Sequence, residues 1–278
     1  MKNTGERFIP GEMGVNQLEH LNRYYFVVNQ FDLKNKIVLD IASGEGYGSS
    51  LLAKFAKTVI GVDIDSETVE HAKNKYQRSN LNYILGNAIA IPLADKSVDL
   101  VVSFETIEHH DKHIEMILEI KRVLKADGIL IISSPDKYYY SDIVNFKNEF
   151  HLKELYNNEF KELMCNNFAK TVFFSQKTFT GSIIVLDEES EFYKKPLVVD
   201  KAGDVSTFLP LYNIAICSEN HNFTLNYQIV MYKESDNVLS SIDIDIAKQK
   251  IRLTKTYRIG NLILKPFKLL KQLCSVDK

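Results

Sequence analysis

The chain has 278 residues, 45% of them hydrophobic and 25% charged, which is enough to bury a full core in one large domain with additions. A formal net charge of -2 gives no overall basic field, which argues against sequence-independent binding to nucleic acid. The three cysteines, Cys165, Cys217 and Cys274, are widely spaced, which excludes a disulfide framework and favours a reducing compartment. No stretch approaches about 18 uninterrupted apolar residues, and no secretion signal stands at the start, so we expect a cytoplasmic chain.

Between residues 37 and 134, short β-branched runs alternate with amphipathic windows, a pattern typical of a parallel sheet covered by helices. We predict strands at 37–41, 58–63, 82–86, 98–103 and 128–133, and helices at 47–56, 66–78 and 112–124. Further along, we predict a helix near 152–164 and β-like runs at 168–175, 180–186 and 211–217. The last two runs compete for the final core strand, and we favour 211–217.

This choice makes 177–209 an insertion before the last strand, beside the site. The predicted organisation is a helical cap over the site at 1–36, a core domain at 37–218 and a C-terminal extension at 219–278. Within the extension, residues 244–273 interleave lysine and arginine with apolar residues, and Pro266 should kink or split any helix there. This basic amphipathic tail either docks on protein, its own surface or a second subunit, or binds an anionic membrane face.

The most informative stretch is VLDIASGEGYG at 38–48, where an apolar strand leads into a glycine loop that carries two acids. Glycine loops that open a helix usually hold phosphate, because backbone N–H groups and the positive helix end attract anions. Asp40 and Glu45 would oppose a pyrophosphate there, but they would suit a ligand with a sulfonium and an ammonium group. The loop therefore predicts S-adenosylmethionine as the cofactor.

A second predicted strand ends on Asp63, 19 positions after Gly44, where a carboxylate is placed to accept both ribose hydroxyls. NAD shares that feature, but Ser49 stands where the dinucleotide fingerprint requires Gly or Ala. After the third strand, Asn87 and Ala88 could present a side-chain amide and a backbone N–H to an adenine edge. The alternative is a simple turn, which Gly-Asn pairs also favour.

The ordered series VLDIASGEGYG, GVDID, GNA, PLADKSVDLVVSFETIEH and LKADGILIISSP resembles the class I S-adenosylmethionine-dependent methyltransferases over roughly residues 37–135. The resemblance implies a Rossmann-like α/β fold, with a mostly parallel seven-stranded sheet whose last strand runs antiparallel and with helices on both faces. It also implies that the methionine end lies at the glycine loop, the ribose at Asp63 and the adenine at Asn87. The predicted cofactor-binding residues are Arg23, Asp40, Ala42, Gly44, Gly46, Asp63, Ile64, Asn87 and Ala88.

A narrower resemblance involves GERFIP at 5–10, EHLNRY at 19–24 and FHLKELY at 150–156, which are similar to methyltransferases encoded with bacterial surface-polysaccharide synthesis. It implies a sugar or glycan intermediate as the acceptor. Arg23 is the candidate cation for the methionine carboxylate, since the acidic loop cannot supply one. The alternative is a surface arginine on an N-terminal helix.

Methyl transfer to a hydroxyl is an in-line displacement that depends on positioning and benefits from a nearby base. His109 and His151 are the predicted catalytic residues, because both follow strands whose carboxyl ends border the expected site and an imidazole titrates near neutrality. Glu105 and Glu108 are alternative bases or orienting partners, although 108–111 also reads as a polar lead-in to a helix.

His109, His110 and His113 lie close in sequence, but no acid or cysteine stands at ligand spacing, so no metal site is predicted. The run at 138–140 consists of three tyrosines, which either form a sugar-stacking surface or anchor a partly buried loop.

We therefore predict S-adenosylmethionine-dependent O-methylation of a sugar or glycan intermediate, with peripheral contact at the inner membrane face and an oligomer both left open. The alternatives are a methyltransferase for a quinone-like or other lipophilic small molecule, a non-catalytic S-adenosylmethionine-binding scaffold, and an NAD-dependent oxidoreductase. Methylation of nucleic-acid bases is disfavoured, because the fourth strand ends in SFET rather than in an Asn/Asp-Pro-Pro-aromatic run.

Overall fold

The structure is a computed structural model that describes residues 15–178, 182–187, 197–199, 205–207, 209–226 and 229–232. All of these belong to one compact unit, Met1–Lys233. The second unit, Glu234–Lys278, lies outside the described residues, as do residues 1–14. The basic amphipathic tail at 244–273 and the motif at 5–10 therefore stay predictions.

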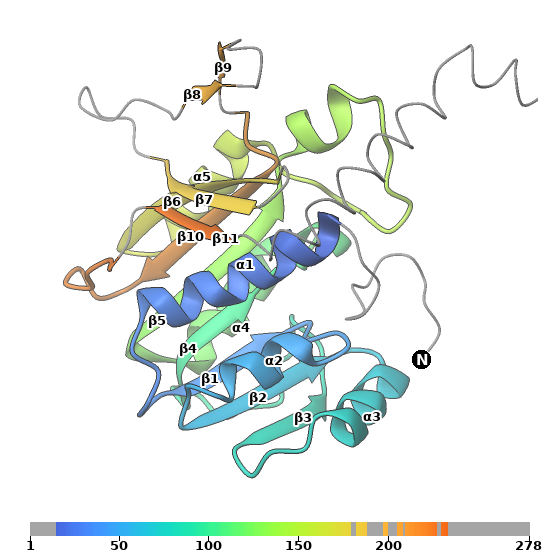
Figure 1. The fold of residues 1–278 in the computed structure, drawn as a ribbon. Coiled ribbons are helices and arrows are strands. Elements are labelled where there is room, and N and C mark those ends of the chain that lie inside the picture. The colour runs from blue at the N-terminus through green and yellow to red at the C-terminus, as the bar shows by residue number, and fades with distance from the viewer. Residues whose placement is uncertain are drawn as a thin grey trace, which may run out of the picture. The chain divides into compact units, whose positions relative to one another are not determined.

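A nine-stranded mixed sheet forms the centre of the unit, in the order β11-β7-β6-β10-β5-β4-β1-β2-β3 (Figure 1). The parallel strands are β1 (Ile37–Ile41), β2 (Thr58–Asp63), β3 (Leu81–Leu85), β4 (Val98–Ser103) and β5 (Leu124–Pro135). Antiparallel pairing joins β5 to β10 (Tyr212–Ser218), and then β6 (Lys170–Thr178), β7 (Ser182–Leu186) and β11 (Ile229–Tyr232). Two short strands, β8 (Leu197–Val199) and β9 (Val205–Thr207), pair in a separate sheet.

The predicted count of seven strands is wrong, because the sheet has nine. The runs at 182–186 and 212–218, which were predicted as alternatives for one strand, both form strands of it. β10 inserts antiparallel between β5 and β6, and all its residues are buried, so the strand predicted at 211–217 is confirmed to within one residue at each end, although β11 follows it in the same sheet. β7 extends the sheet beyond β6, and β11 pairs with its outer edge. The segment at 177–209, predicted as an insertion, thus contributes a strand to the main sheet.

Five α-helices are described: α1 (Val15–Gln30), α2 (Tyr47–Leu52), α3 (Ser66–Lys75), α4 (His113–Val123) and α5 (Asn157–Asn167). α2 ends earlier than predicted, where the Asn80 amide donates to the carbonyl oxygens of Ala53 and Ala56. These bonds satisfy carbonyl groups that a helix end leaves without intrahelical partners. α5 begins later than predicted, because a capping box between Tyr156 and Glu159 sets its first turn.

Helices cover both faces of the sheet, as predicted, and α1 crosses one face in Figure 1. Successive side chains of β1 point to opposite faces of the sheet, so this strand contributes to the core on both faces. Val38 packs in a cluster with Phe26 of α1 and Leu52 of α2, whereas Leu39 packs in a cluster with α4 and α5. Within the described part of the chain, no helix combines the length and the apolar character needed to cross a membrane.

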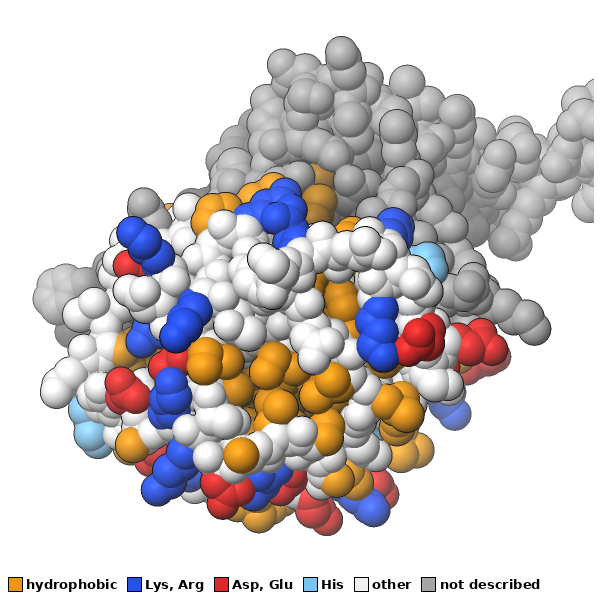
Figure 2. Space-filling view, turned by 90° about the horizontal axis from the view of Figure 1, so that it is seen from below, with side chains coloured by type: hydrophobic (Ala, Val, Ile, Leu, Met, Phe, Trp, Pro, Cys, Tyr) orange, Lys and Arg blue, Asp and Glu red, His pale blue; other side chains and the backbone are white. Residues whose placement is uncertain are grey.

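The surface seen from below carries both charge signs around a patch of hydrophobic side chains (Figure 2). Lysine, arginine and acidic side chains lie interspersed on this face.

Candidate active site

A cavity of about 1290 Å³ opens at the carboxyl ends of the parallel strands. Segments that follow four neighbouring strands line it: 41–45 after β1, 62–64 at the end of β2, 86–89 after β3 and 104–106 after β4. Ligands of open α/β sheets bind at this edge, because the loops there converge without blocking the strands. Predicted site residues that line the cavity are Ala42, Gly44, Asp63, Ile64, Asn87, Ala88, Glu105, Glu108, His109 and His151.

The glycine loop has three residues at positive φ, Ala42 at 55°, Gly44 at 54° and Gly46 at 96°. Gly46 faces away from the cavity: the Tyr83 hydroxyl donates to its carbonyl oxygen over 2.7 Å, and an added Cβ would lie 2.8 Å from that hydroxyl. Gly44 lines the cavity, and the nearest atom to an added Cβ would be the Ala42 oxygen at 3.9 Å. Gly46 therefore holds the loop on β3, while Gly44 presents backbone to the cavity.

Asp63 is fixed in orientation by two backbone groups. Its Oδ2 accepts the N–H of Gly44 over 2.9 Å, and its Oδ1 accepts that of Asp65 over 3.0 Å. The carboxylate is buried at the end of β2 and still contributes to the cavity lining. It therefore joins the glycine loop to the start of α3 at the place predicted for the ribose.

Asp40 lies fully buried beneath the cavity and does not line it. Its carboxylate accepts hydrogen bonds from the Ser49 hydroxyl over 2.6 Å and from the Tyr24 hydroxyl over 3.2 Å. Burial raises the pKa of Asp40 to about 7. Asp40 thus connects β1 to α2 and α1, and Tyr24 stands between it and the cavity.

Glu45, the second acid of the loop, does line the cavity, and its carboxylate is tied to α3. It accepts a hydrogen bond from the Tyr76 hydroxyl over 2.7 Å, lies 3.1 Å from Nε2 of His71, and pairs with Lys75. The loop is thereby held from two sides, by Tyr83 of β3 and by the end of α3.

Arg23 is fully buried, so its interpretation as a surface arginine is wrong. Its Nε donates to Oε1 of Gln176 over 2.7 Å, and its guanidinium carbon lies 4.3 Å from the centre of the Tyr212 ring. Its Nη2 lies 3.5 Å from Oε1 of Glu105. Arg23 does not line the cavity, but Glu105 and Tyr212 do, so it lies directly behind the wall.

Asn87 forms the turn that was its alternative interpretation, and its contact with adenine stays a prediction. Its Oδ1 accepts the N–H of Ile89 over 3.1 Å, which is the turn that a Gly-Asn pair favours. Asn87 and Ala88 nevertheless line the cavity beside Ile64. An adenine would meet the Asn87 amide group at this wall.

Glu105 turns the chain sharply after β4, with a φ of 48° that non-glycine residues rarely adopt. The Ser133 hydroxyl on β5 donates to its Oε1 over 2.5 Å, and Arg23 pairs with the same oxygen. Strained backbone of this kind gathers at functional sites, where the surrounding contacts hold it in place. Here the contacts come from α1 and β5.

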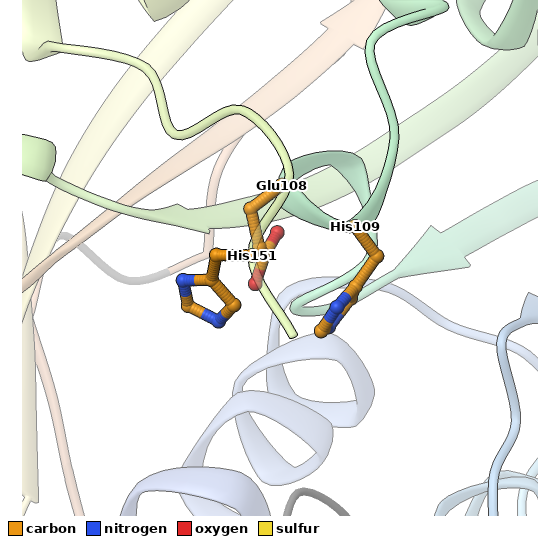
Figure 3. Close-up of side chains that lie close together, drawn as sticks. All are labelled: Glu108, His109 and His151. Carbon is orange, nitrogen blue, oxygen red and sulfur yellow. The ribbon is translucent and has the colours of Figure 1, made fainter. Parts of the chain in front are cut away.

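Three predicted catalytic residues from two distant segments meet at the cavity wall (Figure 3). Glu108 and His109 stand on the short helix Ile107–His109, and His151 stands in the loop before α5. One polar atom from each lies within 4.8 Å of the others. We call these three side chains the Glu-His-His group. The N–H groups of Leu152 and Lys153 donate to the Glu108 carbonyl oxygen, which joins the two segments.

Sequence reasoning missed the partners that orient this group. Glu154 lies 2.5 Å from Nδ1 of His151, and Tyr140 stacks on the His151 ring with 5.4 Å between ring centres. The carbonyl oxygen of Phe150 lies 3.0 Å from Nδ1 of His109. The spacing of Glu154, three residues after His151, was a usable signal. The tyrosine run at 138–140 thus supplies a ring that packs on a histidine at the cavity.

Comparisons with known proteins agree with this architecture. Residues 39–132 match the family model described as a methyltransferase domain. A probable S-adenosylmethionine-dependent methyltransferase of Mycolicibacterium smegmatis is 36% identical over 162 residues, which cover 58% of this chain and 62% of that protein. A fatty-acid O-methyltransferase of the same organism is 26% identical over 137 residues, covering 47% of this chain and 50% of that protein. The match thus covers less than two thirds of either relative.

Among solved structures, the YcgJ protein of Bacillus subtilis has the same fold, with a TM-score of 0.54 at 17% identity. The superposition covers 78% of this chain and 100% of that one. Residues 39–132 thus match a methyltransferase domain, and the sheet order and cavity position agree with the Rossmann-like fold of class I S-adenosylmethionine-dependent methyltransferases. The cofactor of this class is S-adenosylmethionine, as the glycine loop predicted.

The lining residues fit this cofactor. The described lining holds seven carboxylates and two lysines: Glu19, Glu45, Asp63, Glu105, Glu108, Asp111 and Glu149, with Lys112 and Lys147. A predominantly acidic cavity attracts a ligand that carries sulfonium and ammonium charges and repels a pyrophosphate.

Proposed function

We propose that this protein transfers a methyl group from S-adenosylmethionine to a hydroxyl oxygen of a sugar or glycan intermediate in surface-polysaccharide synthesis. One observation carries the proposal: a single cavity is lined both by the cofactor-side residues after β1 to β3 and by the Glu-His-His group. The cofactor, when bound, supplies a methyl group on a positively charged sulfur. The protein's residues must then bind it, position the acceptor and take up a proton.

On the cofactor side, Asp63 would accept the ribose hydroxyls, and the Gly44 backbone would lie along the methionine part. Asn87 and Ala88 would contact the adenine. Arg23 would attract the methionine carboxylate electrostatically from behind the cavity wall. Its two terminal nitrogens make no hydrogen bond to the described residues. The buried pair with Glu105 would hold it there.

On the acceptor side, the charge of the lining favours a neutral substrate. Glu105, Glu108 and Asp111 border this part of the cavity and would repel an acceptor that carries its own carboxylate. A sugar offers hydroxyl groups that can donate to these oxygens, and the rings of Tyr140 and Tyr212 provide flat apolar surfaces beside them. This combination supports a sugar over a free fatty acid.

A hydroxyl acceptor must lose its proton as it attacks, and the Glu-His-His group is placed to receive it. A proton on Nδ1 of His151, facing the Glu154 carboxylate, would leave Nε2 as the basic nitrogen. Glu154 would then stabilise the positive charge that His151 gains. His109, whose ring lies edge-on to that of His151 at 5.2 Å, is the second candidate for this role.

A lipophilic acceptor is the second candidate substrate. The name of the fatty-acid O-methyltransferase supports it, as do the exposed large apolar side chains of the segment before α5: Ile143, Val144, Phe146 and Phe150. Phe146 and Phe150 also line the cavity. A sugar attached to a lipid carrier would satisfy both sets of residues.

The test is a transfer assay with methyl-labelled S-adenosylmethionine and the full chain. Acceptors would include neutral sugar nucleotides, glycan fragments from surface polysaccharides, lipid-linked sugars and free fatty acids, with products identified by mass spectrometry. Labelled sugar ethers that are absent with His151→Ala support the proposal. Labelling of fatty acids alone would favour the lipophilic acceptor, and cofactor binding without transfer to any acceptor would favour a scaffold.

We also propose that the tail at 244–273 places the protein at an anionic membrane face, which would bring it to lipid-linked substrates. The interleaved basic and apolar residues support this proposal. Truncation after Asp245 should abolish sedimentation with anionic liposomes, and undiminished sedimentation would exclude the tail as the anchor. The cytoplasmic location stays a prediction.

A further inference from the structure

We propose that the Glu-His-His group is a binding site for a divalent transition-metal ion of the zinc or manganese type. Within the described residues, Glu108, His109 and His151 are the one set of three potential ligands whose donor atoms lie within 4.8 Å of one another (Figure 3). Bonds of about 2.1 Å to one ion would place donor atoms at most about 4.2 Å apart, so small side-chain rotations would close the site.

The outer contacts of the two histidines are those of metal ligands. The Phe150 carbonyl oxygen, 3.0 Å from Nδ1 of His109, can only accept, which puts the ring proton on Nδ1 and the lone pair on Nε2. The Glu154 carboxylate, 2.5 Å from Nδ1 of His151, does the same for that ring. Metal-binding histidines almost always donate their second N–H to a carbonyl or carboxylate, which fixes the ring and raises its basicity.

The group is also held in place before any ion binds. The Glu108 side chain is only 1% exposed, and its backbone carbonyl accepts from Leu152 and Lys153, which lie next to His151. Tyr140 stacks on the His151 ring and limits its rotation. Ligands whose rotamers are already fixed lose little conformational freedom on binding.

The contact between His151 and Asn148 would have to change. Nε2 of His151 accepts a hydrogen bond from the Asn148 amide over 3.0 Å, so an ion would take the place of that donor. Asn148 stands in a loop and is only partly buried, which allows its side chain to turn away. Removal of the Asn148 side chain should therefore leave metal binding intact or strengthen it.

The ligand types select the ion. Two imidazoles favour zinc, manganese, iron or cobalt over magnesium and calcium, which prefer oxygen ligands throughout. Three protein ligands leave coordination positions open, and all three residues line the cavity. If the proposed function holds, an acceptor hydroxyl would occupy such a position and the ion would lower its pKa. Its proton would then pass to solvent instead of to His151, because imidazoles bound to the ion could not accept it.

The experiment uses the full chain without an affinity tag, treated with a chelator and then titrated with Co²⁺ and Zn²⁺. Visible absorption of the cobalt form and calorimetry with zinc should give one ion per chain and a rise in Tm. His109→Ala and Glu108→Gln should weaken Co²⁺ binding by at least about tenfold, and Glu154→Gln by about 10- to 100-fold. His221→Ala, at an exposed histidine elsewhere on the unit, should stay within about twofold of wild type, whereas Asn148→Ala should bind Co²⁺ as tightly as wild type or more tightly.

Absence of binding would overturn the proposal, and so would an affinity that His109→Ala leaves unchanged or that His221→Ala lowers equally. Glu108→Gln preserves the shape of the side chain, so its effect separates loss of a ligand charge from loss of folding, which circular dichroism would monitor. If protein treated with chelator binds no metal but still transfers methyl groups, the metal site is refuted and the proposed function is supported. If the protein binds metal but transfers no methyl group to any acceptor, the metal site is supported and the proposed function is refuted.

Discussion

Nη2 of Arg23 lies 3.5 Å from Oε1 of Glu105, an ion pair that joins α1 to the strained turn after β4. Arg23 is fully buried, while the Glu105 side chain is 16% exposed. Removal of one member of a buried pair leaves the other charge unpaired and costs about 3–5 kcal/mol. We expect Arg23→Met to lower the free energy of unfolding by about 3 kcal/mol in urea denaturation, toward the lower end of that range.

Arg78→Met is the matched control, because Arg78 is exposed at the end of the α3 region. Its effect should stay within about 0.5 kcal/mol. Similar losses in the two variants would show that the Arg23 pair does not hold α1 in place.

Gly48 packs against the Tyr24 ring, and an added Cβ would lie 2.0 Å from Cζ of that ring. Tyr24 cannot retreat easily, because its hydroxyl donates to buried Asp40. We expect Gly48→Ala to destabilise the protein by about 1–3 kcal/mol, measured by thermal unfolding. Ser50→Ala in the same helix serves as the control, because it removes a hydroxyl group and adds no atom beside Tyr24, and an equal loss there would refute the explanation.

Asp40 should make the stability depend on pH. Burial raises its pKa to about 7 in the folded chain, from the 3.8 of an unburied aspartate. The folded state therefore holds the proton more tightly than the unfolded state does. The stabilising effect is complete below pH 3.8, declines as the pH rises from there to about 7, and is lost above that value.

Asp40→Asn cannot ionise, so its Tm should fall less than that of wild type between acidic and mildly alkaline pH. Thermal unfolding across that range would measure the difference. Asp95→Asn, at an exposed position, serves as the control. Parallel curves for wild type and Asp40→Asn would mean that Asp40 does not titrate in this range.

Asp63→Asn should weaken the binding of S-adenosylmethionine by about 10- to 100-fold, since a charge-assisted hydrogen bond contributes about 1.5–3 kcal/mol. The demethylated product carries the same ribose and should lose affinity equally, which calorimetry with both ligands would show. Unequal losses would place Asp63 near the sulfur instead. Asp95→Asn should bind both ligands like wild type.

Local patterns in the sequence were sufficient for much of the central fold. The strands at 37–41, 58–63 and 98–103 are confirmed at both ends, because hydrophobic runs and the glycine loop that follows the first are set by neighbouring residues. The cofactor follows from the same local signal, since the acids of the loop lie within a few residues of its glycines. Asp63 could be named because its distance from the loop is fixed by one helix.

Only the tertiary structure decided which distant segments meet. It buried Arg23 against Glu105 and Tyr212, added β7 and β11 to the sheet, and brought His151 with Glu154 to Glu108 and His109. Each of these depends on the pairing of strands or loops that lie far apart in the chain. Hydrophobic periodicity records which face of an element is buried, but not which other element covers it.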